Sequence, residues 1–289
     1  MKLKYLGTCA AEGFPGMFCS CETCEKARRL GGRNIRTRSQ ALVDGELLID
    51  FPADTYLHVL NYGLDLRKIK ACIITHSHDD HCYAYDFQYR MHGYAYFPDE
   101  SKKEPLEVYS SYATGAKLRS YFAAICMDEN DKNAVHCNNV RAFESFFADG
   151  YKITPLKADH DIKTEPLIYI IEKDNKALLY AHDTGYFLPE TWDYIEKSNI
   201  RFDFVSLDCT CILDDDAVRN HMGLKTCKEV KDRLLKNKNA DEKTVFCVNH
   251  FSHNGRLVYD DLVPVAEKLG FKVYFISVST KFDKNRHGK

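Results

Sequence analysis

This sequence lacks the features that mark secreted, membrane-spanning and nucleic-acid-binding proteins. Residues 1–7 contain no apolar stretch of the kind found in secretory signals, and they lead into a predicted strand. No run in the chain approaches the ~18 apolar residues that a membrane span requires. The net charge is −2 and the pI is about 6.6, so no basic surface for nucleic acid is indicated. We therefore expect a cytoplasmic protein that binds neither a membrane nor nucleic acid.

Linkers rich in proline, glycine and serine are missing too, and so are internal repeats, which excludes a string of modules or a solenoid. Hydrophobic residues make up 45% of the 289 residues, enough to bury a large core. The 12 cysteines, without a secretory signal, indicate a reducing compartment in which thiols are buried or bind metal. We expect one domain over residues 1–280 and a solvated basic tail over residues 281–289.

Apolar periodicity predicts an α/β protein. The expected strands are 3–6, 40–43, 46–49, 72–74, 106–109, 152–156, 167–171, 177–180, 204–207, 245–248 and 272–276. The expected helices are 55–61, 82–93, 114–124, 189–198, 226–235 and 262–269. Periodicity does not decide how these elements are arranged in space.

One segment directly after the predicted strand 72–74 concentrates metal-binding side chains. Three histidines and two aspartates stand within six positions: His76, His78, Asp79, Asp80 and His81. Imidazole and carboxylate are ligands that zinc and similar divalent metals prefer. In an extended backbone His76 and His78 point to the same side, because alternate side chains share a face. Asp80 and His81 follow in the next turn, from which they can reach a second ion.

The pattern His-x-His-x-Asp-His at residues 76–81 resembles that of the metallo-β-lactamase superfamily of binuclear metal hydrolases. The resemblance implies an αββα sandwich, in which two mixed sheets lie face to face, helices flank them, and the ligands gather at one edge. It also implies three further ligands, each just after a strand, for which the sequence offers His160, Asp183 and His250. Histidine at position 78, where di-iron redox relatives carry glutamate, favours hydrolysis.

The resemblance assigns these ligands to two divalent ions. One ion would be held by His76, His78 and His160, the other by Asp80, His81 and His250, with Asp183 as the bridge. Zinc and manganese are the expected active-site metals and iron is a third candidate, because imidazole and carboxylate suit all three. Two ions ~3.5–4 Å apart supply a hydroxide near neutral pH and neutralise charge on a phosphoryl group. We expect Asp80 or Asp183 to orient that hydroxide.

A second group of metal-binding residues lies near the N-terminus. Cys19, Cys21 and Cys24 supply three thiols within six residues, which suits three corners of a tetrahedral structural zinc site. His253, three residues after His250, is our candidate for the fourth ligand. This Cys-x-Cys-x-x-Cys knuckle with a closing His-x-x-His is similar to the family of the phosphoribosyl 1,2-cyclic phosphate phosphodiesterases of the carbon–phosphorus lyase pathway.

That family also carries an Asn-His pair, found here as Asn220 and His221. The resemblance makes His221 the candidate general acid or phosphate-binding group, outside the metal set. The alternative for His221 is a surface position before the helix 226–235. Asp50 and Asp54, after the strand 46–49, are candidates to orient ligand imidazoles by accepting their hydrogen bonds.

Two departures from the family pattern leave the substrate open. His182 precedes the bridging aspartate where the family often has serine, and the interval between the first cluster and His160 looks longer than in the phosphodiesterases. The extra residues include an aromatic stretch at 89–97, which either packs on the core as a helix or lines a pocket, and a polar stretch at 127–139. Surface or core positions, not ligand positions, are predicted for His136 and Cys137.

The expected function is that of a binuclear metal-dependent hydrolase. Within this class the favoured activity is that of a phosphodiesterase, which cleaves a small cyclic phosphate diester with a metal-bound hydroxide. A nuclease of the tRNase Z type would share the metal core, but the neutral pI and the lack of a basic arm count against it. A thioesterase or lactonase of the same superfamily would use the aromatic stretch to shape an acyl pocket. A non-catalytic metal-binding protein is the least favoured alternative. The expected partner is a small phosphorylated substrate, and a homodimer is compatible with the sequence.

Overall fold

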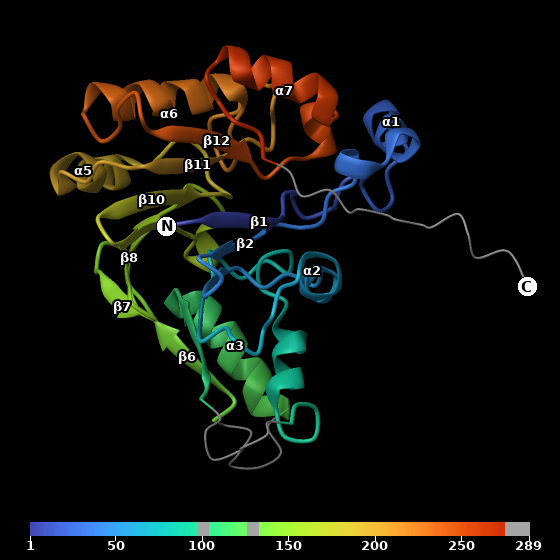
Figure 1. The fold of residues 1–289 in the computed structure, drawn as a ribbon, viewed down its shortest axis with the longest axis vertical. Helices are drawn as coiled ribbons and strands as arrows, with labels where there is room; N and C mark the ends of the chain where they lie inside the picture. Colours follow the sequence, from blue (N-terminus) through green and yellow to red (C-terminus); the bar gives the residue numbers. More distant parts are fainter. Residues whose placement is uncertain (97–103, 126–132, 275–289) are drawn as a thin grey trace, which may run out of the picture.

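Two mixed six-stranded sheets lie face to face in the computed structural model, which describes residues 1–96, 104–125 and 133–274 (Figure 1). The strand order is β1-β2-β3-β4-β5-β6 in the first sheet and β12-β11-β10-β9-β8-β7 in the second. Helices flank both sheets on the outside. The predicted αββα sandwich is therefore confirmed.

The first sheet consists of β1 (Leu3–Gly7), β2 (Gln40–Val43), β3 (Leu47–Ile49), β4 (Ala71–Ile73), β5 (Leu106–Ser110) and β6 (Val135–Asn139). The second consists of β7 (Phe146–Ala148), β8 (Tyr151–Lys157), β9 (Leu167–Lys173), β10 (Lys176–Ala181), β11 (Phe204–Asp208) and β12 (Val245–Asn249). In each sheet an antiparallel part, β1 to β3 or β7 to β10, continues into a parallel part, β3 to β6 or β10 to β12. Polar residues that follow the parallel strands therefore gather at the carboxyl edges, where ligands of α/β proteins bind.

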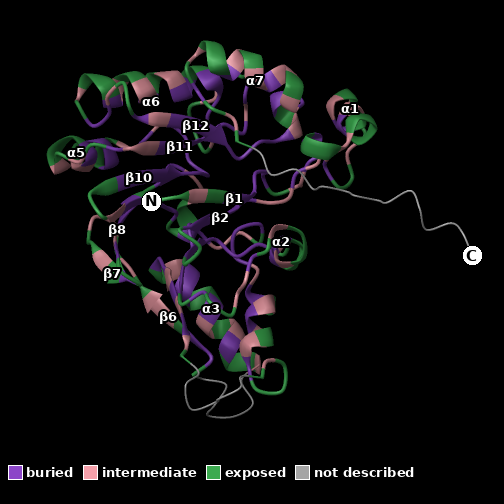
Figure 2. Ribbon diagram, viewed as in Figure 1, coloured by how far each residue is buried: buried purple, intermediate pink, exposed green. Residues whose placement is uncertain are grey.

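Alternating burial along the strands separates the core into layers. In β10, Leu178 and Tyr180 pack between the two sheets, whereas Leu179 and Ala181 pack with Trp192 under the outer helices. Figure 2 shows the buried residues of the second sheet lying beneath helices whose outer surfaces are exposed. Both faces of this strand are apolar because both faces are covered.

The helices are α1 (Glu22–Leu30), α2 (Thr55–Tyr62), α3 (Tyr112–Ile125), α5 (Pro189–Ser198), α6 (Leu224–Lys236) and α7 (Tyr259–Lys268). In α6, Cys227, Val230 and Leu234 recur at three- and four-residue steps and are buried, so the helix turns one apolar face towards the second sheet. No helix in the described ranges combines the length and the apolar composition that crossing a membrane requires.

The helix predicted at 82–93 is wrong. Residues Ala84–Arg90 form a 3-10 helix instead. The reason lies in the preceding backbone: the N–H of Phe51 donates to the carbonyl of His81, and the N–H of Tyr83 donates to the carbonyl of Phe51, each at 2.7 Å. These bonds hold Cys82 in a parallel bridge with Phe51, so an α-helix cannot begin at residue 82.

The aromatic stretch at 89–97 does not form the predicted α-helix in the part that the structure describes, which ends at residue 96, and the alternative that it lines a pocket stays a prediction. Met91 packs in the core of the first sheet, but Tyr89, Tyr94 and Tyr96 are exposed on the surface. In the polar stretch, residues 127–132 lie outside the described ranges. His136 contacts Glu107 on the neighbouring strand, with 2.9 Å between Nδ1 and Oε1, and Cys137 is half-buried.

Among the α-helices and strands of the described residues, the sequence did not predict α1, β6 and β7. Conversely, the strand predicted at 272–276 is present up to residue 274 only as an isolated bridge between Lys272 and Cys247. The predicted tail at 281–289 lies outside the described residues.

Candidate metal centre

The buried carboxylate of Asp50 organises the histidine-rich loop after β4. Oδ1 of Asp50 accepts hydrogen bonds from the backbone N–H and the hydroxyl of Thr75, at 2.8 and 2.9 Å. Its Oδ2 lies 2.7 Å from Nδ1 of His81. This contact, predicted for Asp50, leaves Nε2 of His81 as the ring atom that faces the other candidate ligands.

Asp54 does not act in the same way, so that part of the prediction is wrong. Its two carboxylate oxygens pair with Arg38, one with the guanidinium at 2.9 Å and one with the backbone N–H at 2.7 Å. An aspartate at the start of α2 is thereby used to hold the segment before β2.

The first predicted ligand set is brought together. The nitrogens of His76, His78 and His160 that could bind an ion lie within 4.8 Å of one another. Nε2 of His160 is 3.3 Å from Nδ1 of His78. Nε2 of His76 is buried and has no hydrogen-bond partner among the described residues. Burial lowers the pKa of His76 well below its usual value, so the ring is neutral, the form in which imidazole binds metal.

The second set also converges. The ligand atoms of Asp80, His81, Asp183 and His250 lie within 4.8 Å of one another, and all four residues are buried. Nε2 of His81 is 3.3 Å from Oδ2 of Asp80 and 3.2 Å from Nε2 of His250.

Asp183 lies between the two sets, as expected of the bridging residue. Its Oδ2 is 2.5 Å from Nε2 of His81, 3.3 Å from Nε2 of His250 and 3.6 Å from Nε2 of His76. Its Oδ1 is 4.0 Å from Nε2 of His160. Asp183, His250 and Asp50 all have left-handed backbone conformations, with φ of 50°, 62° and 65°. Such strain in residues other than glycine concentrates at functional sites.

The donor groups fit two divalent ions. Two pairs of imidazole nitrogens face each other at 3.2 and 3.3 Å, and one further nitrogen is buried without a partner in the described chain. Buried polar atoms normally have partners, and a cation among these nitrogens would satisfy them together. Binding itself, and the choice among zinc, manganese and iron, stay predictions.

Sequence reasoning missed Asp208, the fully buried last residue of β11. Its Oδ2 accepts a hydrogen bond from the backbone N–H of Asp183 at 3.1 Å and lies 3.2 Å from Nδ1 of His250. The N–H groups of Thr210 and Met222 donate to its Oδ1 at 3.1 and 3.0 Å. These contacts hold two predicted ligands in place. The signal for it existed, because Asp208 follows a predicted strand, as the other candidates do.

His221 is half-buried beside the second set. Its Nδ1 is 3.1 Å from Oδ2 of Asp208 and 3.3 Å from Oδ1 of Asp183. Burial alone would lower the pKa of His221, but the neighbouring carboxylate of Asp208 raises it to about 9. Because Nδ1 lies within 4.8 Å of the ligand atoms of Asp183, Asp208 and His250, His221 is closer to the metal-binding groups than the sequence indicated.

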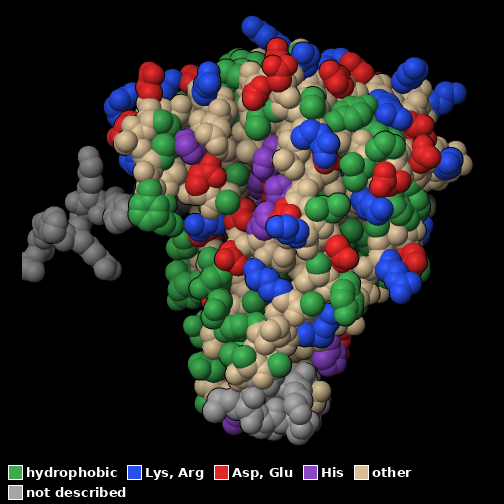
Figure 3. All heavy atoms as spheres, turned by 180° about the vertical axis from the view of Figure 1, so that it is seen from behind, with side chains coloured by type: hydrophobic (Ala, Val, Ile, Leu, Met, Phe, Trp, Pro, Cys, Tyr) green, Lys and Arg blue, Asp and Glu red, His purple; other side chains and the backbone are tan. Residues whose placement is uncertain are grey.

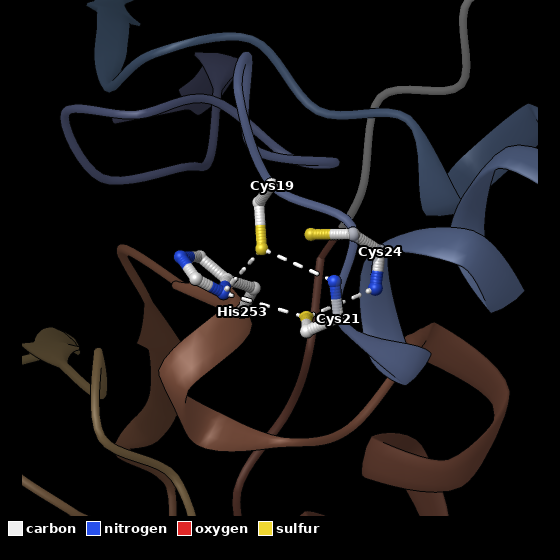
Figure 4. Close-up of side chains that lie close together, drawn as sticks. All are labelled: Cys19, Cys21, Cys24 and His253. Carbon is white, nitrogen blue, oxygen red and sulfur yellow. Dashed lines mark hydrogen bonds between the residues drawn. The ribbon is translucent and has the colours of Figure 1, made fainter.

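The cysteine knuckle is assembled as predicted (Figure 4). Cys21 caps the N-terminus of α1, Cys24 is in its first turn, and Nδ1 of His253 lies 3.4 and 3.6 Å from the sulfurs of Cys19 and Cys21. Burial opposes ionisation, yet the Cys24 N–H and the neighbouring side chains lower the pKa of Cys21 to about 6. Burial and the two neighbouring cysteines raise the pKa of Cys24 to about 12, so Cys21 loses its proton before Cys24. The three sulfurs and one imidazole nitrogen lie within 4.8 Å of one another, a donor set that suits a structural zinc ion.

A cavity of about 550 Å³ opens beside the first ligand set. It is lined by Ala11, Arg38, Ala53, Ser77, His78, Asp79, Asp80, Tyr83 and Lys117. In Figure 3, histidines gather in a central hollow of the surface, and charged side chains of both signs surround them. Of the candidate ligands, His78 and Asp80 line this cavity, and the side chain of His78 is 41% exposed.

Comparisons with known proteins place the chain in a family. A sequence model of the β-lactamase superfamily domain matches residues 50–239. No protein of curated function matches this sequence. Among solved structures, a diphosphatase from the PhnP family has a TM-score of 0.68 and 20% identity over 95% of this chain and 94% of its own. Zinc-bound PqqB from Methylobacterium extorquens has a TM-score of 0.69 and 17% identity over 96% and 98% of the two chains.

The short form of human tRNase Z aligns with a TM-score of 0.59 and 15% identity over 87% of this chain and 93% of its own. At these identities the likeness to solved structures shows the shared fold. Together with the family match over residues 50–239 and the buried cluster at the sheet edges, it leads to one conclusion. The chain belongs to the β-lactamase superfamily, as a hydrolase of metallo-β-lactamase fold whose buried histidine and aspartate cluster is consistent with a binuclear metal site.

Proposed function

We propose that this protein is a metal-dependent phosphodiesterase that cleaves a small cyclic or activated phosphate diester. One observation carries the choice of substrate class: His221, held by the buried carboxylate of Asp208, lies 3.3 Å from Asp183 in the centre of the cluster. Burial lowers and Asp208 raises its pKa, to about 9, so this imidazole carries a proton near neutral pH.

A proton donor at this place suits a diester. When an alkoxide leaves from phosphorus it needs a proton, and a positioned histidine supplies one. A thiolate leaving group has a far lower pKa, near 8.5, and depends much less on an acid. The cations Arg38 and Lys117 in the adjoining cavity also favour an anionic substrate.

The residues of the cluster have separate roles in this reaction. The ligand sets centred on His76 and on His81 would each hold one divalent ion, with Asp183 between them. When bound, such ions supply a Lewis acid for the phosphoryl oxygen and lower the pKa of a water molecule. Asp80 or Asp183 would orient the attacking water molecule by accepting its hydrogen bond. His221 donates its proton to the departing oxygen, and Asp208 keeps the ring in position and protonated.

The proposal is tested by turnover of ribosyl 1,2-cyclic phosphate, a 2′,3′-cyclic nucleotide, bis-p-nitrophenyl phosphate, a phosphate monoester and a panel of thioesters. We expect hydrolysis of diesters and little of the monoester, since its second negative charge lets it occupy the metal pair and exclude the nucleophile. The variant His78→Ala, which lacks a predicted ligand, serves as the control for contaminating activity.

Each alternative function has its own outcome. Faster turnover of thioesters or lactones would assign the site to acyl chemistry. Cleavage of a tRNA precursor in preference to small diesters would indicate a nuclease of the tRNase Z type. Inactivity towards every substrate, with metal bound, would leave a metal-binding protein without turnover.

A further inference from the structure

His182 directly precedes the candidate bridging residue Asp183 and is buried in the layer between the two sheets, beside Tyr5 and Tyr180. We propose that His182 is a positioning residue for the metal cluster. It fixes the backbone at Asp183, so that the bridging carboxylate is in place before an ion binds. The inference concerns metal binding and does not depend on whether the substrate is a phosphodiester.

Two hydrogen bonds tie His182 to neighbouring segments of the chain. Its Nε2 lies 2.7 Å from Oγ of Ser206 on β11, and its Nδ1 lies 3.4 Å from Oγ of Ser39, just before β2. A neutral imidazole has one donor nitrogen and one acceptor nitrogen, and a hydroxyl can serve as either partner. Both hydrogen bonds can therefore be present at once.

The bond to Ser206 anchors the turn after β10 to its neighbour β11, which is parallel to β10 and in register with it. Two residues beyond Ser206, the carboxylate of Asp208 accepts a hydrogen bond from the backbone N–H of Asp183 at 3.1 Å. Residues 182 and 183 are thus held by alternate residues of the same strand, one through its side chain and one through its backbone. The peptide between them cannot rotate without breaking one of these two bonds.

Aromatic rings enclose the imidazole of His182. The ring centre of Tyr180 is 4.0 Å away, and that of Tyr5 on β1 is 6.2 Å away, with 17° between the two ring planes. The hydroxyl of Tyr5 is 2.6 Å from Oγ of Ser206, which links the same network to the first sheet. These four side chains are at most 4% exposed. Because protein interiors are close-packed, the imidazole keeps one orientation, and the turn is held from both sheets.

The backbone of Asp183 needs this support because its φ of 50° lies in the left-handed region. Such a conformation in a residue other than glycine persists only where surrounding contacts hold it. A serine, which the family often has in place of His182, would not fill the space of the ring or present two nitrogens to Ser39 and Ser206. The hold on the turn is therefore a feature of this chain.

His182 is placed to act on the ions only through Asp183. It belongs to none of the candidate ligand groups in the described ranges, and its ring centre is 6.1 Å from that of the predicted ligand His250. Both of its nitrogens face hydroxyl groups. A group that supports a metal ligand in this way typically changes metal affinity by about 10–100-fold.

The experiment measures binding of Mn²⁺ to the full-length protein after chelation has removed the cluster ions. Mn²⁺ is the probe because thiolates do not suit it, so the knuckle contributes little to the signal. We expect His182→Ala to raise the Kd for Mn²⁺ by about 10–100-fold, with the number of ions bound at saturation unchanged. His182→Gln, which keeps a donor and an acceptor, should recover most of the affinity. Ser206→Ala should weaken binding while His182 itself is intact.

The matched control is Asn239→Ala. Asn239 is also buried, and its amide donates to the carbonyls of Ile195 and Ile200, each at 2.9 Å. It lies near the amino end of β11, whereas the cluster lies at the carboxyl end. This variant should lower the free energy of unfolding in urea and leave the affinity for Mn²⁺ at the wild-type value.

Wild-type affinity for Mn²⁺ in both His182→Ala and Ser206→Ala would overturn the inference. An equal loss of affinity in Asn239→Ala would overturn it too, because the effect would then be one of general stability. Loss of one bound ion in His182→Ala would make His182 a ligand instead of a positioning residue. No substrate is used, so failure here leaves the proposed phosphodiesterase activity standing.

Discussion

At the scale of single residues, the pair of His221 and Asp208 carries the most specific prediction. With 3.1 Å between Nδ1 and Oδ2, the carboxylate holds the ring and favours its protonated form. We expect His221→Ala to lower kcat on a diester with an alkoxide leaving group by ~10²–10⁴, the usual range for a lost general acid. The loss should be much smaller with a p-nitrophenolate leaving group, which needs no proton.

Metal content of the same variant decides between two roles for His221. Unchanged content, measured by elemental analysis, is expected of an acid that binds no ion. Loss of one ion would instead make His221 a ligand, as its place beside Asp183 and His250 also permits. Equal rate losses for good and poor leaving groups would leave it with substrate binding only.

The burial of His58, on α2, predicts a pH dependence of folding stability. This dependence does not involve the metal cluster. The ring is buried, with Nδ1 2.6 Å from Oε1 of Gln40 and Nε2 2.8 Å from the hydroxyl of Thr37. Burial lowers its pKa from 6.5 to about 4. The unfolded chain therefore takes up a proton first as pH falls. The contribution of the buried, neutral His58 ring to the free energy of unfolding is complete above pH 6.5, and it is lost as the pH falls to 4.

Urea unfolding of wild-type protein and His58→Gln at pH 7, 5.5 and 4.5 measures this effect. The difference in unfolding free energy should shrink with falling pH by up to about 3 kcal/mol, the free energy that corresponds to the full shift. Comparison with the variant cancels the contributions of other histidines. A difference that stays constant from pH 7 to 4.5 would contradict the prediction.

At the scale of elements, the knuckle joins α1 to the segment after β12. Cys21 is the N-cap of α1 and its sulfur accepts a hydrogen bond from the Cys24 N–H, while His253 comes from a segment more than 220 residues further along the chain. An ion here would crosslink the two ends of the domain. We expect Cys21→Ser to lower the free energy of unfolding by more than about 4 kcal/mol, as loss of a structural metal does.

The opposite pattern is expected for His78→Ala, which should abolish turnover with a much smaller loss of stability. Unfolding curves and turnover numbers for both variants, each prepared with metal in excess, provide the measurement. Loss of activity without loss of stability in Cys21→Ser would show that the knuckle is not structural.

For the whole molecule, the separate ligand groups predict the number of ions. Two ions per chain fit the cluster at the sheet edges, and one fits the knuckle. Elemental analysis after metal-replete purification should therefore approach three ions per chain. Brief chelation should remove activity first, since the cluster opens into the cavity and the knuckle ligands are thiolates that hold zinc tightly. One ion or none per chain would contradict this assignment.

The sequence by itself determined the features that depend on local spacing. The alternation of His76 and His78 and the tight spacing of Cys19, Cys21 and Cys24 predicted two metal-binding groups, because ligands close in sequence are close in any fold. The same holds for α5, found at the predicted bounds, and for most strands, whose apolar patterns are visible without their neighbours. Resemblance to a family added the distant ligands His160, Asp183 and His250.

Only the tertiary structure decided what depends on pairing and approach. β6 consists mostly of polar residues, and β7 is only three residues long. They are strands because β5 pairs with β6 and β8 pairs with β7. Asp208 positions Asp183 and His250 because β10, β11 and β12 are parallel and in register, which aligns their carboxyl ends. Lys117 reaches Ser77 because α3 packs beside the loop. Such contacts join residues distant in sequence, and local patterns carry no information on which distant segments meet.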